Sequence, residues 1–176
     1  MIKDTRAFTM IGILTVTVLL LVAGTSASTT LLNRADAQTP TPTLGKPFLI
    51  ENGKTIGQTE IGPDRTEYTY SANGTLNGTM EITDNGKYVS ISKGNNVYFD
   101  QGQGVIATKD GSEMANYTLI EIDNVTQDGK LIFRGAVVYS TNSTGNLSFL
   151  NNTVSILKGE GDSTTGDFTS TEWELK

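Results

Sequence analysis

Two polar residues in one alternating run are the first candidates for chemistry. In the stretch EMANYTL, Glu113, Ala115 and Tyr117 share one side of a period-two pattern, and Asn116 lies on the other side. If Asn116 faces solvent, Glu113 and Tyr117 face the interior, where a carboxyl beside a phenol could bind a ligand or act as a base with a raised pKa. The alternative is a carboxylate at the barrel mouth that is solvated or paired with a lysine. Glu113 and Tyr117 are therefore ligand-binding candidates, and no residue is predicted to be catalytic.

Asparagines in Asn-x-Ser/Thr triplets form the second candidate set. Such triplets are acceptors for N-glycosylation in an exported protein. The alternative is a chain that is rich in Asn and Thr because it needs turns and polar strand faces. The seven candidates are Asn73, Asn77, Asn116, Asn124, Asn142, Asn146 and Asn151.

The composition argues against several kinds of chemistry. The 176 residues include no His and no Cys, which removes the commonest general base, thiol nucleophiles, disulfides and the usual zinc ligands. No segment has the D-x-D-x-D-G spacing of a calcium loop, and five aspartates are assigned to turns: Asp84, Asp110, Asp123, Asp128 and Asp162. We expect no metal and no cofactor. The net charge of −6, without a cluster of Lys or Arg, argues against nucleic acid as a partner.

A Gly-x-Gly sequence raises the question of a phosphate-binding loop. Gly102 and Gly104 precede Val105, and Lys109 precedes the turn pair Asp110-Gly111. A phosphate loop needs its glycines between a strand and a helix, with Lys-Ser/Thr following directly. Here strand-like sequence follows, so the glycines indicate a bend within a strand.

The N-terminal part has the pattern of an export segment. Basic residues precede an apolar run over 7–27, and small residues suited to cleavage follow. The run is also long enough to span a bilayer if it is not cleaved. We expect residues 1–37 to be a signal peptide or a membrane anchor, 38–45 a Pro/Thr linker, and 46–176 a β-barrel domain outside the cytoplasm. Any contact with a membrane would be made through residues 7–27 of an uncleaved chain.

The rest of the chain alternates between apolar and polar residues, with turn signals between the runs. This pattern predicts an all-β fold with consecutive antiparallel hairpins, including turns at 85–86, 110–111 and 128–129. Closing such a meander into a barrel removes its edges, whereas an open two-sheet sandwich is the alternative. The runs cover about 48–58, 65–72, 74–83, 87–93, 96–108, 112–123, 130–141, 146–158 and 167–175.

Three stretches carry a resemblance to a known family. QGQGVIATKDGSEMANYT, QDGKLIFRGAVVYSTNSTGNLSFLNN and the terminal TSTEWELK resemble the allene oxide cyclase-like barrel superfamily, in particular small bacterial and archaeal members of unknown function. The resemblance covers roughly residues 65–176. It implies an eight-stranded antiparallel barrel with an apolar interior that often forms homo-oligomers. Plant cyclases of this superfamily use a Glu and an Asn on an early strand, and no stretch within 46–72 matches them, because Glu51-Asn52 is a bare pair in a turn-like context.

The alternating runs also predict what fills the barrel. Large inward side chains outnumber small ones, so we expect a mostly filled apolar core with at most a shallow pocket at one mouth. Trp173 alternates with Glu172 and Glu174 and is expected to pack onto the core. The predicted inward residues are Leu76, Gly78, Met80, Ile82, Ala115, Tyr117, Leu119, Phe133, Gly135, Val137, Tyr139, Leu147 and Phe149.

These observations favour an extracytoplasmic β-barrel that binds a small apolar ligand or serves as a surface module. The alternatives are an isomerase or cyclase that works inside the barrel, and a purely structural cell-surface glycoprotein. Enzymatic activity is disfavoured because converging polar groups are scarce in the sequence pattern.

Overall fold

The structure, a computed structural model, describes residues 44–176. The predicted export segment at 1–37 and most of the 38–45 linker lie outside these residues. Within the described part of the chain, no helix has the length and apolar character needed to cross a membrane.

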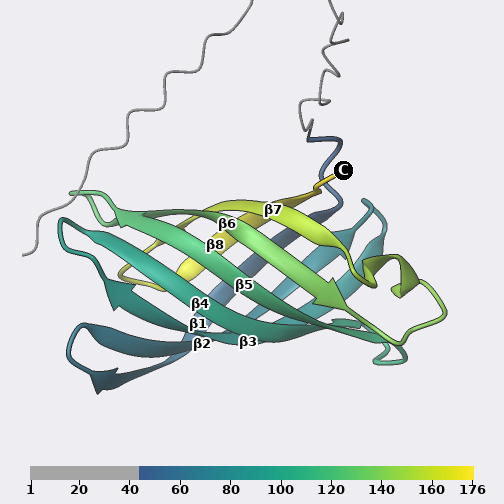
Figure 1. Ribbon diagram of the computed structural model, residues 1–176, viewed down its shortest axis with the longest axis horizontal. Coiled ribbons are helices and arrows are strands. Elements are labelled where there is room, and N and C mark those ends of the chain that lie inside the picture. The colour runs from purple at the N-terminus through teal and green to yellow at the C-terminus, as the bar shows by residue number, and fades with distance from the viewer. Residues whose placement is uncertain (1–43) are drawn as a thin grey trace, which may run out of the picture. The chain divides into compact units, whose positions relative to one another are not determined.

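The described chain forms a closed barrel in which each strand is antiparallel to its neighbours in sequence, and β1 pairs with β8 (Figure 1). The prediction of an eight-stranded antiparallel up-and-down barrel is therefore confirmed. Residues 49, 50 and 51 of β1 pair with 172, 171 and 170 of β8 and so close the sheet. The strands are β1 (Leu49–Gly62), β2 (Arg65–Leu76), β3 (Met80–Ser92), β4 (Val97–Thr108), β5 (Met114–Val125), β6 (Lys130–Ser140), β7 (Val154–Asp162) and β8 (Asp167–Glu174).

Two of the three predicted hairpin turns are confirmed, and the third is wrong. Gly111 and Gly129 have φ angles of 71° and 83°, as their turns require. The predicted turn at 85–86 instead lies inside β3, which pairs with β2 without interruption. The chain turns earlier, at Asn77 and Gly78, whose φ angles are 50° and 77°. Gly78 therefore lies in a turn and not on the inner face.

The connection between β6 and β7 also differs from the prediction. The expected strand over 146–158 begins only at Val154, and Ser148–Leu150 form a short 3-10 helix. Leu147 and Leu150 are completely buried, whereas the predicted core residue Phe149 is 39% exposed. The alternation of Leu147 and Phe149 thus belongs to a loop that buries its own leucines.

The apolar core closes one end of the barrel. The strand ends that meet there contribute Leu49, Leu76, Ile106 and Tyr139, all less than 2% exposed, and the buried Leu147 and Leu150 of the β6–β7 loop join the same cluster. Burial of these apolar side chains stabilises this end of the barrel. The rest of the barrel interior is not filled in this way.

Trp173 has the opposite orientation from the one predicted. Glu172 is 4% exposed and points inward, so its neighbour Trp173 lies on the outer face, where it is half-buried. Residues 172–174 alternate between the two faces as predicted, but the acidic residue and not the aromatic one faces inward. This reversal places a carboxyl group inside the barrel.

Candidate functional site

The barrel contains a cavity of about 420 Å³ that extends to the end opposite the apolar core. Exposed residues of the β7–β8 turn, including Thr164 and Thr165, line its opening. The expectation of a filled barrel with a shallow pocket is therefore wrong. The reason is the composition of the inner face. Beyond the predicted apolar residues, the inward positions of several strands are occupied by acidic residues, hydroxyl residues and glycines, which leave space.

Eight acidic residues line this cavity, and no Lys or Arg of residues 44–176 does so. Tyrosine and phenylalanine rings supply much of the remaining wall, among them Tyr70, Tyr88, Phe133 and Phe168. The prediction of an apolar interior is therefore wrong for the open half of the barrel. Two of the eight, Asp162 and Asp167, are exposed beside the β7–β8 turn. The six inner carboxyl groups belong to Glu51, Asp84, Asp100, Glu121, Asp123 and Glu172.

Glycines on β3 and β4 allow two tyrosines to reach the deep part of the cavity. A Cβ atom at Gly86 would lie 2.5 Å from the Tyr70 hydroxyl oxygen, and one at Gly104 would overlap the Tyr117 hydroxyl. Gly86 and Gly104 pair directly in the register of β3 and β4, which shows no shift along its length. The predicted strand over this region is confirmed, and its glycines serve close side-chain packing rather than phosphate binding.

Tyr117 and Asp84 form the centre of the deep polar layer. The Tyr117 hydroxyl donates to the two carboxyl oxygens of Asp84, at 2.7 and 2.9 Å, and also contacts the Tyr70 hydroxyl. Burial raises the pKa of Asp84 to about 7, although the hydrogen bond from Tyr117 lowers it. Burial raises the pKa of Tyr117 as well, so its hydroxyl remains protonated at physiological pH. Asp84 was predicted to lie in a turn, and this prediction is wrong.

Glu172 and Glu51 complete the deep layer from the strands that close the barrel. Glu172 accepts hydrogen bonds from Tyr139 at 2.9 Å and from Ser155 at 2.5 Å. Glu51 accepts one from Ser170 at 3.2 Å, but its Oε1 atom is buried without a hydrogen-bond partner. Glu51 lies in β1 and faces inward, so the turn-like context predicted for it is wrong.

Burial and mutual repulsion raise the pKa values of these carboxyl groups. Burial raises the pKa of Glu172 to about 7. The pKa of Glu51 is well above its usual value because of burial first, and then because of the nearby charges of Asp84 and Glu172. Either protonation of the carboxyl groups or binding of a cation in the cavity would relieve this repulsion.

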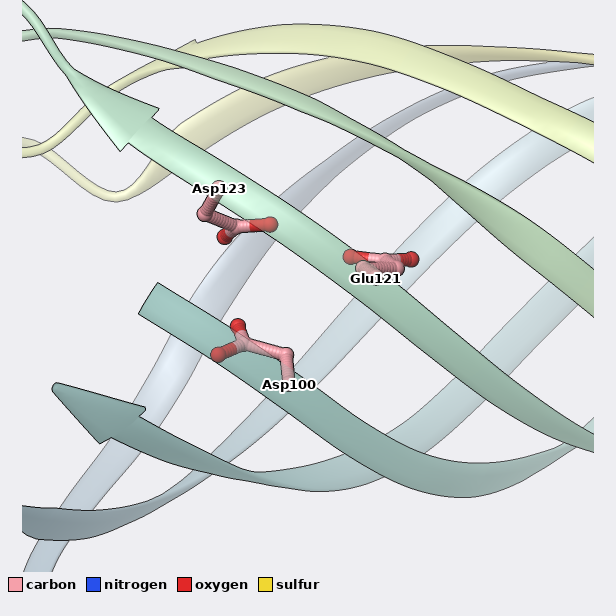
Figure 2. Close-up of side chains that lie close together, drawn as sticks. All are labelled: Asp100, Glu121 and Asp123. Atoms are coloured by element: carbon pink, nitrogen blue, oxygen red, sulfur yellow. The ribbon is translucent and has the colours of Figure 1, made fainter. Parts of the chain in front are cut away.

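Nearer the opening, Asp100 on β4 and Glu121 and Asp123 on β5 form a second acidic layer (Figure 2). One carboxyl oxygen from each residue lies within 4.8 Å of the other two. Burial, and after it the charge of Asp100, raise the pKa of Asp123 to about 9 and that of Glu121 to about 8. Asp123 was also assigned to a turn, and this assignment is wrong because the residue lies within β5.

The structure separates the two predicted ligand-binding residues. Tyr117 is 5% exposed and lines the cavity, as predicted. Glu113 precedes β5, and its carboxylate accepts hydrogen bonds from the backbone N–H groups of Asn146 and Leu147, at 2.9 and 2.8 Å, and from the Ser143 hydroxyl. These bonds lower the pKa of Glu113, contrary to the raised value considered from the sequence. Glu113 therefore holds the β6–β7 loop and is not among the cavity-lining residues.

The glycosylation candidates lie on the outer surface of the described chain. Six of the seven asparagines are exposed, and Asn124 is partly exposed. The turn assignments of Asp110 and Asp128 are confirmed, and hydrogen bonds from Ser112 and Thr126 reach their carboxylates. Asp162 is instead the last residue of β7, and its carboxylate accepts a hydrogen bond from the backbone N–H of Thr164 in the turn that follows.

The sequence did contain a signal for part of the cavity wall. The inward series Tyr117, Leu119 on β5 continues with the same parity to Glu121 and Asp123. The predicted inward residues ended at Leu119, the last apolar residue of this series, because carboxyl groups are rarely buried without a positively charged partner. Glu51 of β1, Asp84 of β3 and Glu172 of β8 share one layer only because of the register of strands far apart in the sequence, and a single sequence carries no signal for that.

The fold and the cavity define a closed antiparallel barrel with an acidic interior, and the comparison with solved structures agrees on the fold. A crystal structure of a conserved protein of unknown function from Rhodopseudomonas palustris is similar, with a TM-score of 0.60 and 16% sequence identity. The match covers 77% of this chain and 99% of that one. No family model matches the sequence. A search of curated proteins likewise gave no match.

Proposed function

We propose that the barrel binds a small organic cation that has an aromatic or otherwise apolar body. The single observation that supports this proposal most strongly is the cavity of about 420 Å³, which carboxyl groups line without any Lys or Arg from the described chain. The unpartnered Oε1 atom of Glu51 supplies an acceptor at the deep end. This proposal replaces the apolar ligand expected from the sequence, because an uncharged apolar molecule would leave the buried carboxyl groups without partners.

The deep layer has the groups needed to hold such a ligand. A protonated amine could donate to Glu51 and to the carboxylates of Asp84 and Glu172, whose attraction for a cation is strong in a poorly solvated site. The rings of Tyr70 and Phe168 pack edge to face, with centroids 5.7 Å apart, and both residues line the cavity. Aromatic faces attract organic cations as well as apolar groups.

Calorimetric titration of the full-length protein with four matched probes tests the proposal. We expect benzylamine and benzyltrimethylammonium to bind, and benzyl alcohol and benzoate to bind at least tenfold more weakly, because only the first two carry a positive charge. Glu51→Gln should reduce binding of benzylamine about tenfold or more. Glu160→Gln is the matched control, because it removes an exposed outer carboxylate that pairs with Lys130. Equal binding of charged and neutral probes would contradict the proposal.

A second candidate function is proton transfer to or from a ligand inside the barrel, as in an isomerase or cyclase. One observation favours it: burial raises the pKa of Asp84 to about 7, and the Tyr117 hydroxyl, 2.7 and 2.9 Å from its two carboxyl oxygens, donates its proton to this group. A general acid or base works best with a pKa near the working pH. Exchange of substrate protons for solvent deuterium, lost in Asp84→Asn, would distinguish this function from binding alone. A purely structural role has less support, because a structural barrel would be filled by its own side chains.

The proposed location remains outside the cytoplasm, and the allene oxide cyclase-like superfamily remains the proposed relationship. The apolar run over 7–27 and the exposed glycosylation triplets support this location. The closed eight-stranded barrel is the fold that the superfamily implies. Intact-mass analysis after cell fractionation tests the location, and an unmodified full-length chain in the cytosolic fraction would contradict it.

A further inference from the structure

The acidic layer at the cavity opening has a geometry of its own. Asp100 and Glu121 are directly opposite each other in the register of β4 and β5, and Asp123 follows two residues later on the same inner face. Figure 2 shows the carboxyl groups of Asp100 and Asp123 turned toward each other, with Glu121 further along β5. Three carboxyl oxygens, one from each residue, lie within 4.8 Å of one another.

Two of these side chains are buried, and one carboxyl oxygen of each has no hydrogen-bond partner. Asp100 is 1% exposed and Asp123 is 5% exposed. The Oδ1 atom of each is fully buried and has no hydrogen-bond partner among the described residues. Buried acceptors without partners are rare in folded proteins and indicate an occupant that the protein atoms do not supply. Because Lys and Arg of the described chain do not line the cavity, this occupant must itself be positive or carry donors.

A proton shared between Asp100 and Asp123 is the simplest occupant, but it leaves the third carboxyl group unexplained. Glu121 extends from the same face toward the same space, where its negative charge would be repelled by that of Asp100. A divalent cation accounts for all three groups. The absence of His and Cys from the whole chain leaves only oxygen ligands, which suit Ca²⁺ and Mg²⁺ rather than Zn²⁺.

We propose that Asp100, Glu121 and Asp123 bind a Ca²⁺ ion at the cavity opening. Ca²⁺ takes oxygen ligands at about 2.3–2.6 Å, so two oxygens on opposite sides of the ion lie about 4.6–5.2 Å apart. The spread of the three carboxyl oxygens fits within that span. Water in the open part of the cavity completes the coordination of six to eight oxygens that Ca²⁺ requires. Mg²⁺ needs shorter, nearly octahedral bonds and should bind more weakly to carboxylates fixed on two strands.

This site is distinct from the organic-cation site of the proposed function. It uses the layer of β4 and β5 at the opening, whereas the organic cation would contact Glu51, Asp84 and Glu172 at the deep end. The two proposals can therefore fail separately. Tyr98 is the register partner of Asp123, and Tyr88 also lines the cavity, so both rings are placed to transfer excitation energy to a lanthanide in the site.

Terbium luminescence of the full-length protein, after treatment with a chelator, tests the proposal. We expect Tb³⁺ to bind with tyrosine-sensitised emission, Ca²⁺ to displace it, and Mg²⁺ to displace it only at a concentration at least tenfold higher. Asp100→Asn and Asp123→Asn should each weaken Tb³⁺ and Ca²⁺ binding at least tenfold. These amides keep the side-chain size and remove a buried negative charge, so circular dichroism should show that both variants fold.

Two controls make the outcome decisive. Glu51→Gln, in the deep layer, should leave Ca²⁺ affinity within about twofold of the wild type while it weakens benzylamine binding. Glu81→Gln removes an exposed carboxylate that pairs with Lys109 and should change neither. The proposal is overturned if Ca²⁺ at millimolar concentration does not bind, which would mean that the cluster holds a proton. It is equally overturned if both aspartate variants bind Ca²⁺ as the wild type does.

Discussion

Tyr117 is the residue that links the closed end of the barrel to its cavity. Its ring packs against Tyr139 with centroids 5.6 Å apart, and its hydroxyl reaches both oxygens of Asp84. The side chain therefore has an apolar part in the core and a polar part in the cavity. A buried carboxylate is tolerated here because the neutral phenol supplies a hydrogen-bond donor where no cationic side chain lines the cavity.

Tyr117→Phe should destabilise the protein and change the ionisation of Asp84. The variant removes a hydroxyl that donates at 2.7 and 2.9 Å, which should cost about 1–3 kcal/mol in the free energy of unfolding. Because that hydrogen bond lowers the pKa of Asp84, its loss should raise this pKa above about 7. Denaturant unfolding and carboxyl NMR titration measure the two effects. Tyr98→Phe, which removes a partly exposed hydroxyl at the opening, should change neither, and equal effects of both variants would contradict the argument.

At the scale of elements, Glu113 organises the long β6–β7 loop. Its carboxylate binds two backbone N–H groups and the Ser143 hydroxyl, and this loop carries Leu147 and Leu150 into the apolar end of the barrel. Hydrogen bonding to the carboxylate explains its lowered pKa. Glu113, which the sequence suggested as a ligand contact, thus helps to close the apolar end of the barrel by holding this loop in place.

Glu113→Gln should loosen this loop without affecting ligand binding. A glutamine side chain offers one acceptor oxygen where the carboxylate offers two, so it cannot accept all three hydrogen bonds. We expect faster cleavage by protease within residues 141–153 and a lower melting temperature. Benzylamine affinity should stay within about twofold of the wild type. A loss of binding with an unchanged cleavage rate would restore Glu113 as a ligand contact.

The elements also show how far a single sequence can be interpreted. Period-two alternation predicted the fold class, most strand positions and the inward orientation of Tyr117 and Phe133. It failed at Asn85-Gly86, because a glycine that makes room for Tyr70 inside a strand looks the same as a turn glycine. It failed again at Glu172 and Trp173, where burial reversed the usual preference of the two residue types. Local patterns carry no information about which distant side chains a register brings together.

At the scale of the whole molecule, repulsion among the buried carboxyl groups destabilises the barrel when no cation is bound. Glu51, Asp84 and Glu172 share one layer, which Tyr70, Tyr117 and Tyr139 also reach. The charge of Glu172 also raises the pKa of Glu121. All these groups are acids, so ionisation of one makes ionisation of the next more costly. Such an arrangement is stable when it holds protons or a bound cation. A site that binds cations is therefore a source of instability when it is empty.

This conflict predicts an unusual dependence of stability on pH. Folding raises the pKa values of Asp84 and Glu172 from their usual range near 4 to about 7, so the folded chain binds more protons than the unfolded chain between those pH values. The free energy of unfolding should therefore fall as pH rises through that window, by several kcal/mol, since each unit of pKa shift corresponds to about 1.4 kcal/mol. Below this window, the lowered pKa of Glu113 acts in the opposite direction, so stability should be greatest between about pH 4 and 5.

Denaturant unfolding of the cation-free protein at pH 5, 7 and 9 measures this dependence. The double variant Asp84→Asn, Glu172→Gln should reduce the slope, because neither replacement ionises, while Glu121 and Asp123 keep their raised pKa values. The double variant Glu81→Gln, Glu160→Gln on the outer wall should keep the slope of the wild type. Adding benzylamine at pH 9 should restore part of the lost stability in the wild type and less in the inner double variant, since the ligand stabilises only the state that binds it. A wild-type stability that stays constant or rises from pH 5 to 8 would show that the inner carboxyl groups are already balanced, and the cation-binding argument would lose its physical basis.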